Sequence, residues 1–258
     1  MSAKEAGIEL IPSLSLQSIW TDINEDGWLF IQQLLEFAIG GARNNAPNDI
    51  LAVGMTQGTW AADALESAAV VNGYNITYVT GAQISSVNLD DYKMFYVPSA
   101  GFNVGGGISQ ADVDLLAARK LEIQTYVNNG GSHVALTADG TLTPYAWLEL
   151  PLPFEIETVW FGTLPLRKTP EGIAAGFTIS DAELSNGVPY HNSFIGPEGF
   201  NGLEVFVKDT GADLIPDTAD DQNITIGIGS GSFGFGTRNP SPGDWNGLVL
   251  ETNSHDRN

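Results

Sequence analysis

Between residues 48 and 150, short apolar runs alternate with helix-like segments, and this alternation constrains the fold more than any other feature of the sequence. The apolar runs are 50–53, 76–79, 93–97 and 133–137, and the main helix-like segments between them are 59–72 and 109–129. Strands that alternate with helices predict βαβ units with right-handed crossovers. We therefore expect an α/β fold in which a parallel sheet is flanked by helices.

The sequence changes character on either side of this repeating region. Before it, apolar residues at helical spacing over 27–42 predict a helix that ends at a Gly-Gly pair. After residue 150, prolines separate short candidate strands, and Ser180 with Glu183 has the spacing of a capping box at the start of a short helix. The candidate strands are 154–160, 202–207, 223–229 and 247–250.

Three regions follow from this reading. We expect residues 1–47 to form an N-terminal segment whose helix packs on the core. Residues 48–150 would then be the α/β core, and residues 151–258 a β-rich elaboration of the same domain.

The charge balance and the absence of cysteine exclude several classes of function. The chain has 31 acidic and 10 basic residues, a formal net charge of −21 and no cysteine. Such a charge repels nucleic acids and anionic membranes, and it favours solubility, salt tolerance or cation binding. Without cysteine there can be no disulfide, thiolate nucleophile or cysteine-bound zinc.

The order of elements resembles that of the class I glutamine amidotransferase-like superfamily, and within it the trehalose-utilisation-protein-like branch. The similarity lies in the apolar run 50–54, the segment 90–98, and the helix that leads through Gly130-Gly131 into the strand at 134–136. It covers about residues 48–150 and implies a flavodoxin-like parallel sheet. Some relatives look like non-enzymatic modules of secreted or surface-attached bacterial proteins.

The resemblance also implies where a nucleophile would lie. In that superfamily, a turn after the strand matching 133–137 carries a cysteine, and a histidine and an acid follow later in the chain. Here Thr137 stands at about that place and Asp139 follows it, so the thiolate chemistry of the family is ruled out. A threonine can act as a nucleophile if a base activates it, and His191 is the candidate base.

The other two histidines are poor candidates for that base. His133 lies on the same strand as Thr137, about 13 Å away along an extended backbone. His255 is three residues from the end of a polar tail. A structural role for His191, in which its ring is hydrogen-bonded in the fold, remains the alternative to catalysis.

Ligands of open α/β sheets bind at the carboxyl ends of the strands, and small polar residues follow two of the expected strands. The candidate ligand-binding residues are Gly54, Thr56, Gln57, Ser99 and Gly101. The alternative is that these residues only form tight turns, which need permissive backbones.

An acidic run in the last third of the chain could hold calcium, a cation that takes several oxygen ligands. The candidate ligands are Asp217, Asp220, Asp221 and Asn223, which fit only half of an EF-hand spacing. A solvated turn is the alternative. The Gly-rich stretch 229–234 matches a dinucleotide-binding pattern but no helix start follows it, which favours a turn.

Aromatic residues near expected loops could stack on sugars, or could anchor the core instead. These residues are Tyr145, Trp147, Trp160 and Trp245.

The reading that best fits these features is a non-enzymatic, amidotransferase-like structural or binding module of an extracellular or surface-associated protein. We expect no cofactor other than calcium, and the expected partners are further copies of the chain or an extracellular polysaccharide. The first alternative is a hydrolase-like enzyme with a Thr/His/Asp or metal site at the ends of the parallel strands. The second is a carbohydrate- or calcium-binding module. No secretion signal is visible at the start of the sequence, so a cytoplasmic location stays open.

Overall fold

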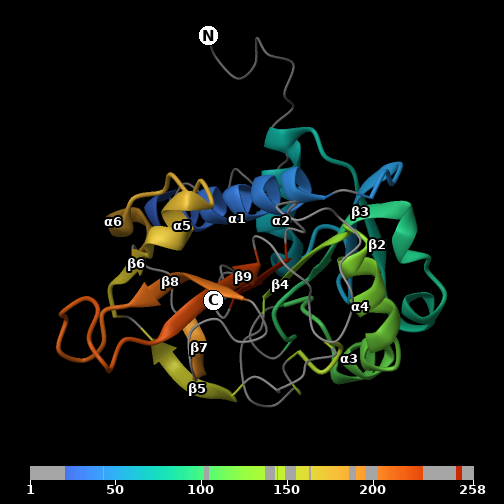
Figure 1. Ribbon diagram of the computed structural model, residues 1–258. Helices are drawn as coiled ribbons and strands as arrows, with labels where there is room; N and C mark the ends of the chain where they lie inside the picture. The colour runs from blue at the N-terminus through green and yellow to red at the C-terminus, as the bar shows by residue number, and fades with distance from the viewer. Residues whose placement is uncertain are drawn as a thin grey trace, which may run out of the picture.

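The computed structural model describes residues 21–42, 44–101, 105–136, 143, 145–148, 155–162, 164–185, 190–195, 203–228 and 248–251. Ten strands belong to one sheet, in the order β2-β1-β3-β4-β10-β9-β7-β5, and β8 pairs with both β9 and β6 (Figure 1).

Five neighbouring strands of this sheet run parallel. They are β2 (Ile76–Val79), β1 (Asn48–Val53), β3 (Tyr92–Val97), β4 (Ser132–Leu136) and β10 (Leu248–Glu251). The four early apolar runs therefore lie side by side and point the same way, and the expected parallel sheet flanked by helices is confirmed. The fifth parallel strand comes from the C-terminal end of the described chain, which joins the same sheet rather than a separate layer.

The rest of the sheet is antiparallel and comes from the second half of the chain. Its strands are β5 (Glu155–Gly162), β6 (Leu166–Lys168), β7 (Tyr190–Ile195), β8 (Glu204–Asp209) and β9 (Asn223–Ile228). β9 pairs antiparallel with β10 and so connects the two halves. The β-rich elaboration is thus confirmed, with two strands, β6 and β7, that the sequence reading did not predict.

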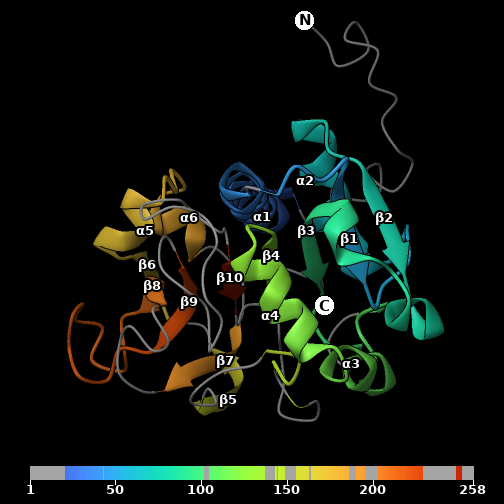
Figure 2. The same cartoon turned by 45° about the vertical axis from the view of Figure 1, so that its right-hand side comes forward.

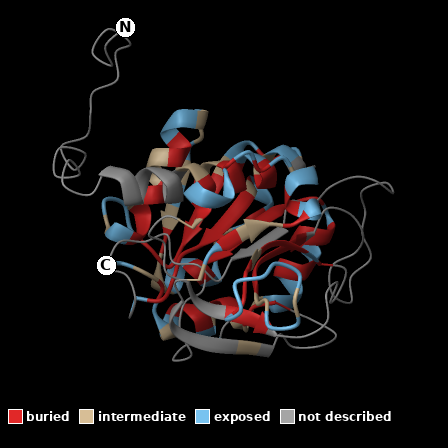
Figure 3. Cartoon of the chain, turned by 90° about the vertical axis from the view of Figure 1, so that its left-hand side faces the viewer, coloured by how far each residue is buried: buried red, intermediate tan, exposed pale blue. Residues whose placement is uncertain are grey.

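Helices cover both faces of the parallel strands (Figure 2). Side chains of α1 (Thr21–Gly41) and α2 (Trp60–Asn72) pack on one face, against alternate residues of β1, β3 and β4. Side chains of α3 (Gln110–Ala117) and α4 (Lys120–Asn128) pack on the other face. The central strands β1, β3 and β4 are therefore buried on both sides, as their continuous apolar sequence requires (Figure 3).

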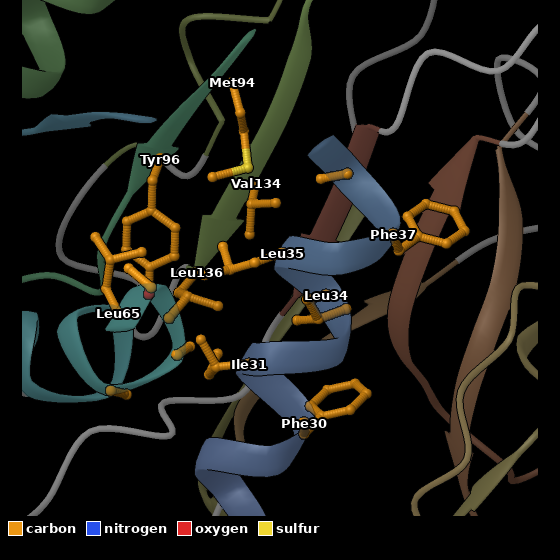
Figure 4. Close-up of a cluster of buried hydrophobic side chains, with 14 of the residues drawn as sticks. Phe30, Ile31, Leu34, Leu35, Phe37, Leu65, Met94, Tyr96, Val134 and Leu136 are labelled. Atoms are coloured by element: carbon orange, nitrogen blue, oxygen red, sulfur yellow. The ribbon is translucent and has the colours of Figure 1, made fainter. Parts of the chain in front are cut away.

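On the α1 face of the sheet, the described side chains form one apolar core (Figure 4), and a second core covers the opposite face. Ile31, Leu34 and Leu35 of α1 are fully buried and lie over Val134 and Leu136 of β4. The short helices α5 (Pro170–Ala174) and α6 (Asp181–Leu184) extend this layer over the antiparallel strands. One apolar layer thus spans both halves of the sheet.

The single helix expected over 109–129 is wrong, because the structure breaks it into α3 and α4 at Ala118 and Arg119. The Arg119 guanidinium is turned inward and donates hydrogen bonds to the carbonyl oxygens of Ile84 and Val87. The break lets this side chain reach the short 3₁₀ helix at Gly81–Ser85 and the turn that follows it.

Candidate functional site

The loops that follow β1 and β3 lie at the carboxyl edge of the parallel sheet, where ligands of such folds bind. A third segment, residues 105–109, lies against both of them. The Ile108 N–H donates to the carbonyl of Ser99 at 2.9 Å, and the Gly101 N–H donates to the carbonyl of Ile108 at 2.9 Å. The Ala61 N–H, in the first turn of α2, donates to the carbonyl of Gly105 at 3.2 Å. Residues 105–109 therefore join the two loops.

The side chain of Ile108 packs directly against Gly54, just after the carboxyl end of β1. Gly54 has a φ of +78°, and a Cβ placed on it would overlap Cγ1 of Ile108. Gly54 and Ile108 are both buried. Only a residue without a side chain fits here, so the requirement for glycine is explained by packing against Ile108 and by the backbone conformation.

The structure divides the five predicted ligand-binding residues into two sets. Gly54 and Ser99 are buried, whereas Thr56, Gln57 and Gly101 are exposed. The hydroxyl of Ser99 is buried and has no hydrogen-bond partner among the residues that the structure describes. The five residues lie along the same edge of the sheet, and ligand binding by them stays a prediction.

Glu66 of α2 holds the loop after β1 in place. Its Oε1 accepts hydrogen bonds from the Gly58 N–H at 2.9 Å and from the Tyr78 hydroxyl at 2.7 Å. Burial and the hydrogen bond to Glu66 raise the pKa of Tyr78, so the phenol stays protonated and remains the donor. The sequence reading did not identify Glu66, because its partners are set by how α2 lies against β2.

The predicted catalytic residues are only partly described. Thr137 and Asp139 lie outside the described residues, and His191 lies in β7, where only its backbone is described. β10 and β9 lie between β4 and β7 in the sheet. With a strand spacing of about 4.8 Å, three such steps separate the backbones by about 14 Å in a flat sheet. A contact between Thr137 and His191 stays a prediction.

His133 is buried in β4 and both of its ring nitrogens are engaged. Nδ1 lies 3.1 Å from the carbonyl oxygen of Phe95, and Nε2 accepts a hydrogen bond from the Trp147 indole N–H at 3.0 Å. This pattern places the proton of the neutral imidazole on Nδ1. Burial lowers the pKa of His133 to about 3, although its hydrogen bond to Phe95 acts in the opposite direction. The ring is thus a neutral part of the core, stacked on Phe95 at a centroid distance of 3.7 Å.

Two aromatic residues considered for sugar stacking are core anchors. Tyr145 and Trp147 are both buried, and Tyr145 stacks on Phe194 of β7. Through Trp147 and Tyr145, the turn that carries them contacts His133 of β4 and Phe194 of β7, and so packs against both halves of the sheet. Trp160 lies in β5 with its side chain undescribed, and Trp245 lies outside the described residues.

The acidic loop between β8 and β9 uses its carboxylates as internal hydrogen-bond acceptors. Asp220 accepts from the N–H groups of Ala212 and Asp213 at 2.7 and 3.3 Å, and from the Thr218 hydroxyl at 2.8 Å. Among the described residues, no group of three or more His, Asp or Glu side chains could hold a metal ion. Calcium binding by this loop stays a prediction.

The four predicted calcium ligands do not all have the same partners and are not gathered around one point. Asp217 and Asp221 both bind Arg167 of β6, at 2.6 and 2.8 Å. Asn223 is buried in β9, and its side-chain amide donates to the carbonyl of Phe194 at 3.3 Å. Burial acts to raise the pKa of Asp221, but hydrogen bonds from Arg167 and from the Asp217 N–H outweigh it and leave the pKa lowered.

Comparisons with known proteins give a fold likeness alone. The sequence matches no family model and no curated protein. Among solved structures, a glutamine amidotransferase from Thermotoga maritima is similar at a TM-score of 0.42 and 8% identity, over 80% of this chain and 75% of that one. Within the described residues, no helix is long and apolar enough to cross a membrane.

Proposed function

We propose that this chain is a non-enzymatic binding or structural module built on an amidotransferase-like α/β fold. The observation that carries the proposal is the packing of Ile108 against Gly54 at the carboxyl edge of the parallel strands. An enzyme with its active site at the end of β1 would need an open pocket there. The buried Ile108 side chain fills the space over Gly54, while Thr56, Gln57 and Gly58 of the same loop are exposed.

The side chains that could act as a nucleophile or a base support the same proposal. The chain has no cysteine, so the thiolate of the resembling family has no counterpart. Both nitrogens of His133 are engaged, and its lowered pKa keeps it from accepting a proton near neutral pH.

We place this module outside the cell or at its surface, where it would bind a polysaccharide or further copies of itself. The net charge of −21 supports this placement, because a strongly acidic surface stays soluble at high and variable salt.

A hydrolysis assay tests the absence of catalysis. The purified chain is incubated with p-nitrophenyl acetate and, separately, with glutamine, beside the variants Thr137→Ala and His191→Ala. Thr77→Ala, an exposed strand threonine, serves as the matched control. We expect all four proteins to give the same background rate. Turnover that is lost in Thr137→Ala or His191→Ala but kept in Thr77→Ala would overturn the proposal.

A further inference from the structure

Trp60 is a large aromatic side chain that the fold holds in an exposed position. It is the first residue of α2, directly after the loop that follows β1, and its side chain is 58% exposed. The six-membered part of its ring lies over Gly105, where an added Cβ would be 3.7 Å from Cε3. Among the described residues, the indole therefore lies against the backbone of Gly105, while much of the residue stays exposed.

In the described segments 56–58 and 105–106, the residues near Trp60 in the chain or under its ring are polar or small. Thr56, Gln57, Gly58 and the two glycines 105 and 106 are all exposed. The other exposed large apolar residues of α2 are Val70 and Val71, at its far end. At 1.5 Å rise per residue they lie about 15 Å away. Protein-docking patches have a contiguous apolar centre, so a single aromatic face among hydrogen-bonding groups is a poor site for docking a protein.

The charges of the segments beside Trp60 further limit the class of ligand that could bind. Neither 54–63 nor 105–114 contains Lys, Arg or His, so nothing in these segments would neutralise an anion. The first-turn amides of α2 are already used, because Ala61 donates to the Gly105 carbonyl and Ala62 and Asp63 donate to the Thr59 carbonyl. These segments therefore offer no group that would bind the phosphate of a nucleotide or a free phosphate ion.

A sugar ring and a quaternary ammonium group are two kinds of neutral or cationic ligand that pack against the face of a tryptophan. An ammonium group is held best by a cage of several aromatic rings, and only one ring is present in segments 54–63 and 105–109. A sugar ring instead presents an apolar C–H face to one indole, while its hydroxyls need donors and acceptors at the rim. The Thr56 hydroxyl and the Gln57 amide supply both.

The surface is also held in shape before any ligand arrives. The Thr59 hydroxyl donates to the Thr56 carbonyl at 2.8 Å, and Glu66 holds the Gly58 N–H at 2.9 Å. A loop that is already ordered loses less conformational entropy on binding, which favours affinity for a small ligand.

We infer that Trp60, Thr56 and Gln57 form a binding surface for a neutral saccharide, with the sugar ring stacked on the indole. This inference rests on the proposed binding function and names its ligand class. It also identifies Trp60, which the sequence reading did not single out, as the central contact.

The test is isothermal titration calorimetry of the full chain with three neutral hexasaccharides: cellohexaose, maltohexaose and hexa-N-acetylchitohexaose. We expect at least one to bind, Trp60→Ala to remove the binding, and Gln57→Ala to weaken it by about tenfold, as loss of 1.4 kcal/mol does. Val71→Ala, equally exposed on the same helix, is the matched control and should bind like the parent. Far-ultraviolet circular dichroism and thermal unfolding check that Trp60→Ala remains folded.

Several outcomes would overturn the inference, and they differ from failure of the proposed function. No binding of any hexasaccharide, binding that survives Trp60→Ala, or Trp60-dependent binding of choline alone would each contradict a saccharide surface. The absence of catalysis would stand in all three cases. Release of new reducing ends from a bound hexasaccharide would instead overturn the non-enzymatic proposal and keep the surface.

Discussion

Trp147 donates its indole N–H to Nε2 of His133 across 3.0 Å, and both side chains are buried. The bond ties the turn at 145–148 to β4, one of the five parallel strands of the sheet. Replacing Trp147 by Phe keeps most of the ring but leaves a buried nitrogen acceptor unpaired.

We expect Trp147→Phe to lower the free energy of unfolding by about 1–3 kcal/mol, the usual cost of an unsatisfied buried polar group. Urea denaturation followed by far-ultraviolet circular dichroism measures this change. Trp60→Phe, at an exposed position, is the matched control and should change stability by less than about 0.5 kcal/mol. Equal effects of the two substitutions would show that the hydrogen bond contributes nothing.

The same histidine should make stability depend on pH between its unfolded and folded pKa values. The folded pKa is about 3 and the unfolded value is 6.5, so the unfolded chain binds more protons in this window. Stability is then complete above pH 6.5 and falls by as much as about 1.4 kcal/mol per pH unit as the pH drops toward 3.

Urea midpoints measured at pH 7, 6, 5 and 4 test this slope. The lowered carboxyl pKa values of Asp49 and Asp221 contribute mainly below their ordinary value of 3.8, so they do not produce a slope between pH 6 and 5. His133→Phe, which removes the titrating ring but keeps a stackable aromatic, should flatten the curve in that range. If the dependence of stability on pH is the same in His133→Phe, a group other than His133 causes it.

Gly54 and Gly58 offer a matched pair for measuring the contact with Ile108. Their φ angles are +78° and +70°, but an added Cβ meets Ile108 at Gly54 and meets nothing within 4 Å at Gly58. Gly58→Ala should therefore cost only the left-handed backbone penalty of about 1–2 kcal/mol.

Gly54→Ala should cost more by about 1–3 kcal/mol, which is typical of overpacking a filled site. Thermal or urea unfolding of the two variants gives the difference directly. The double variant Gly54→Ala with Ile108→Ala should cost less than the sum of its single changes, because the added methyl then has room. Additive costs would mean that Ile108 does not occupy that space in solution.

Arg167 binds one exposed and one buried carboxylate, and the two should differ in energetic weight. The Asp217 side chain is 79% exposed and that of Asp221 is 1% exposed. Exposed ion pairs contribute about 0–1 kcal/mol, whereas removing one partner of a buried pair costs about 3–5 kcal/mol. We expect Asp217→Asn to be nearly neutral and Asp221→Asn to lower the unfolding free energy by at least about 2 kcal/mol. A larger loss in Asp217→Asn would contradict this ranking.

Much of the local structure could be predicted because it depends on neighbouring residues. Gly73 caps α2 with a φ of 69°, and Ser180 and Glu183 exchange both hydrogen bonds of the predicted capping box. The sequence does not predict the break between α3 and α4, because the carbonyl partners of Arg119 at the break, Ile84 and Val87, lie more than 30 residues away and meet it only in the folded chain.

The candidate site was predictable in its position but not in its chemistry. The edge of the sheet that carries Gly54 and Ser99 follows from the order of strands and helices. Two features depend on how residues 105–109 lie against the loop after β1. They are the packing of Ile108 against Gly54 and the exposure of Trp60.

The sequence by itself determined the parallel α/β core, because buried strands and capped helices follow from patterns only a few residues long. Only the tertiary structure decided which buried polar groups meet: His133 with Trp147, and Arg167 with Asp221, which lie 14 and 54 residues apart. Such pairs depend on strand order and register, which long-range packing sets, and a local pattern of residue types carries no record of them.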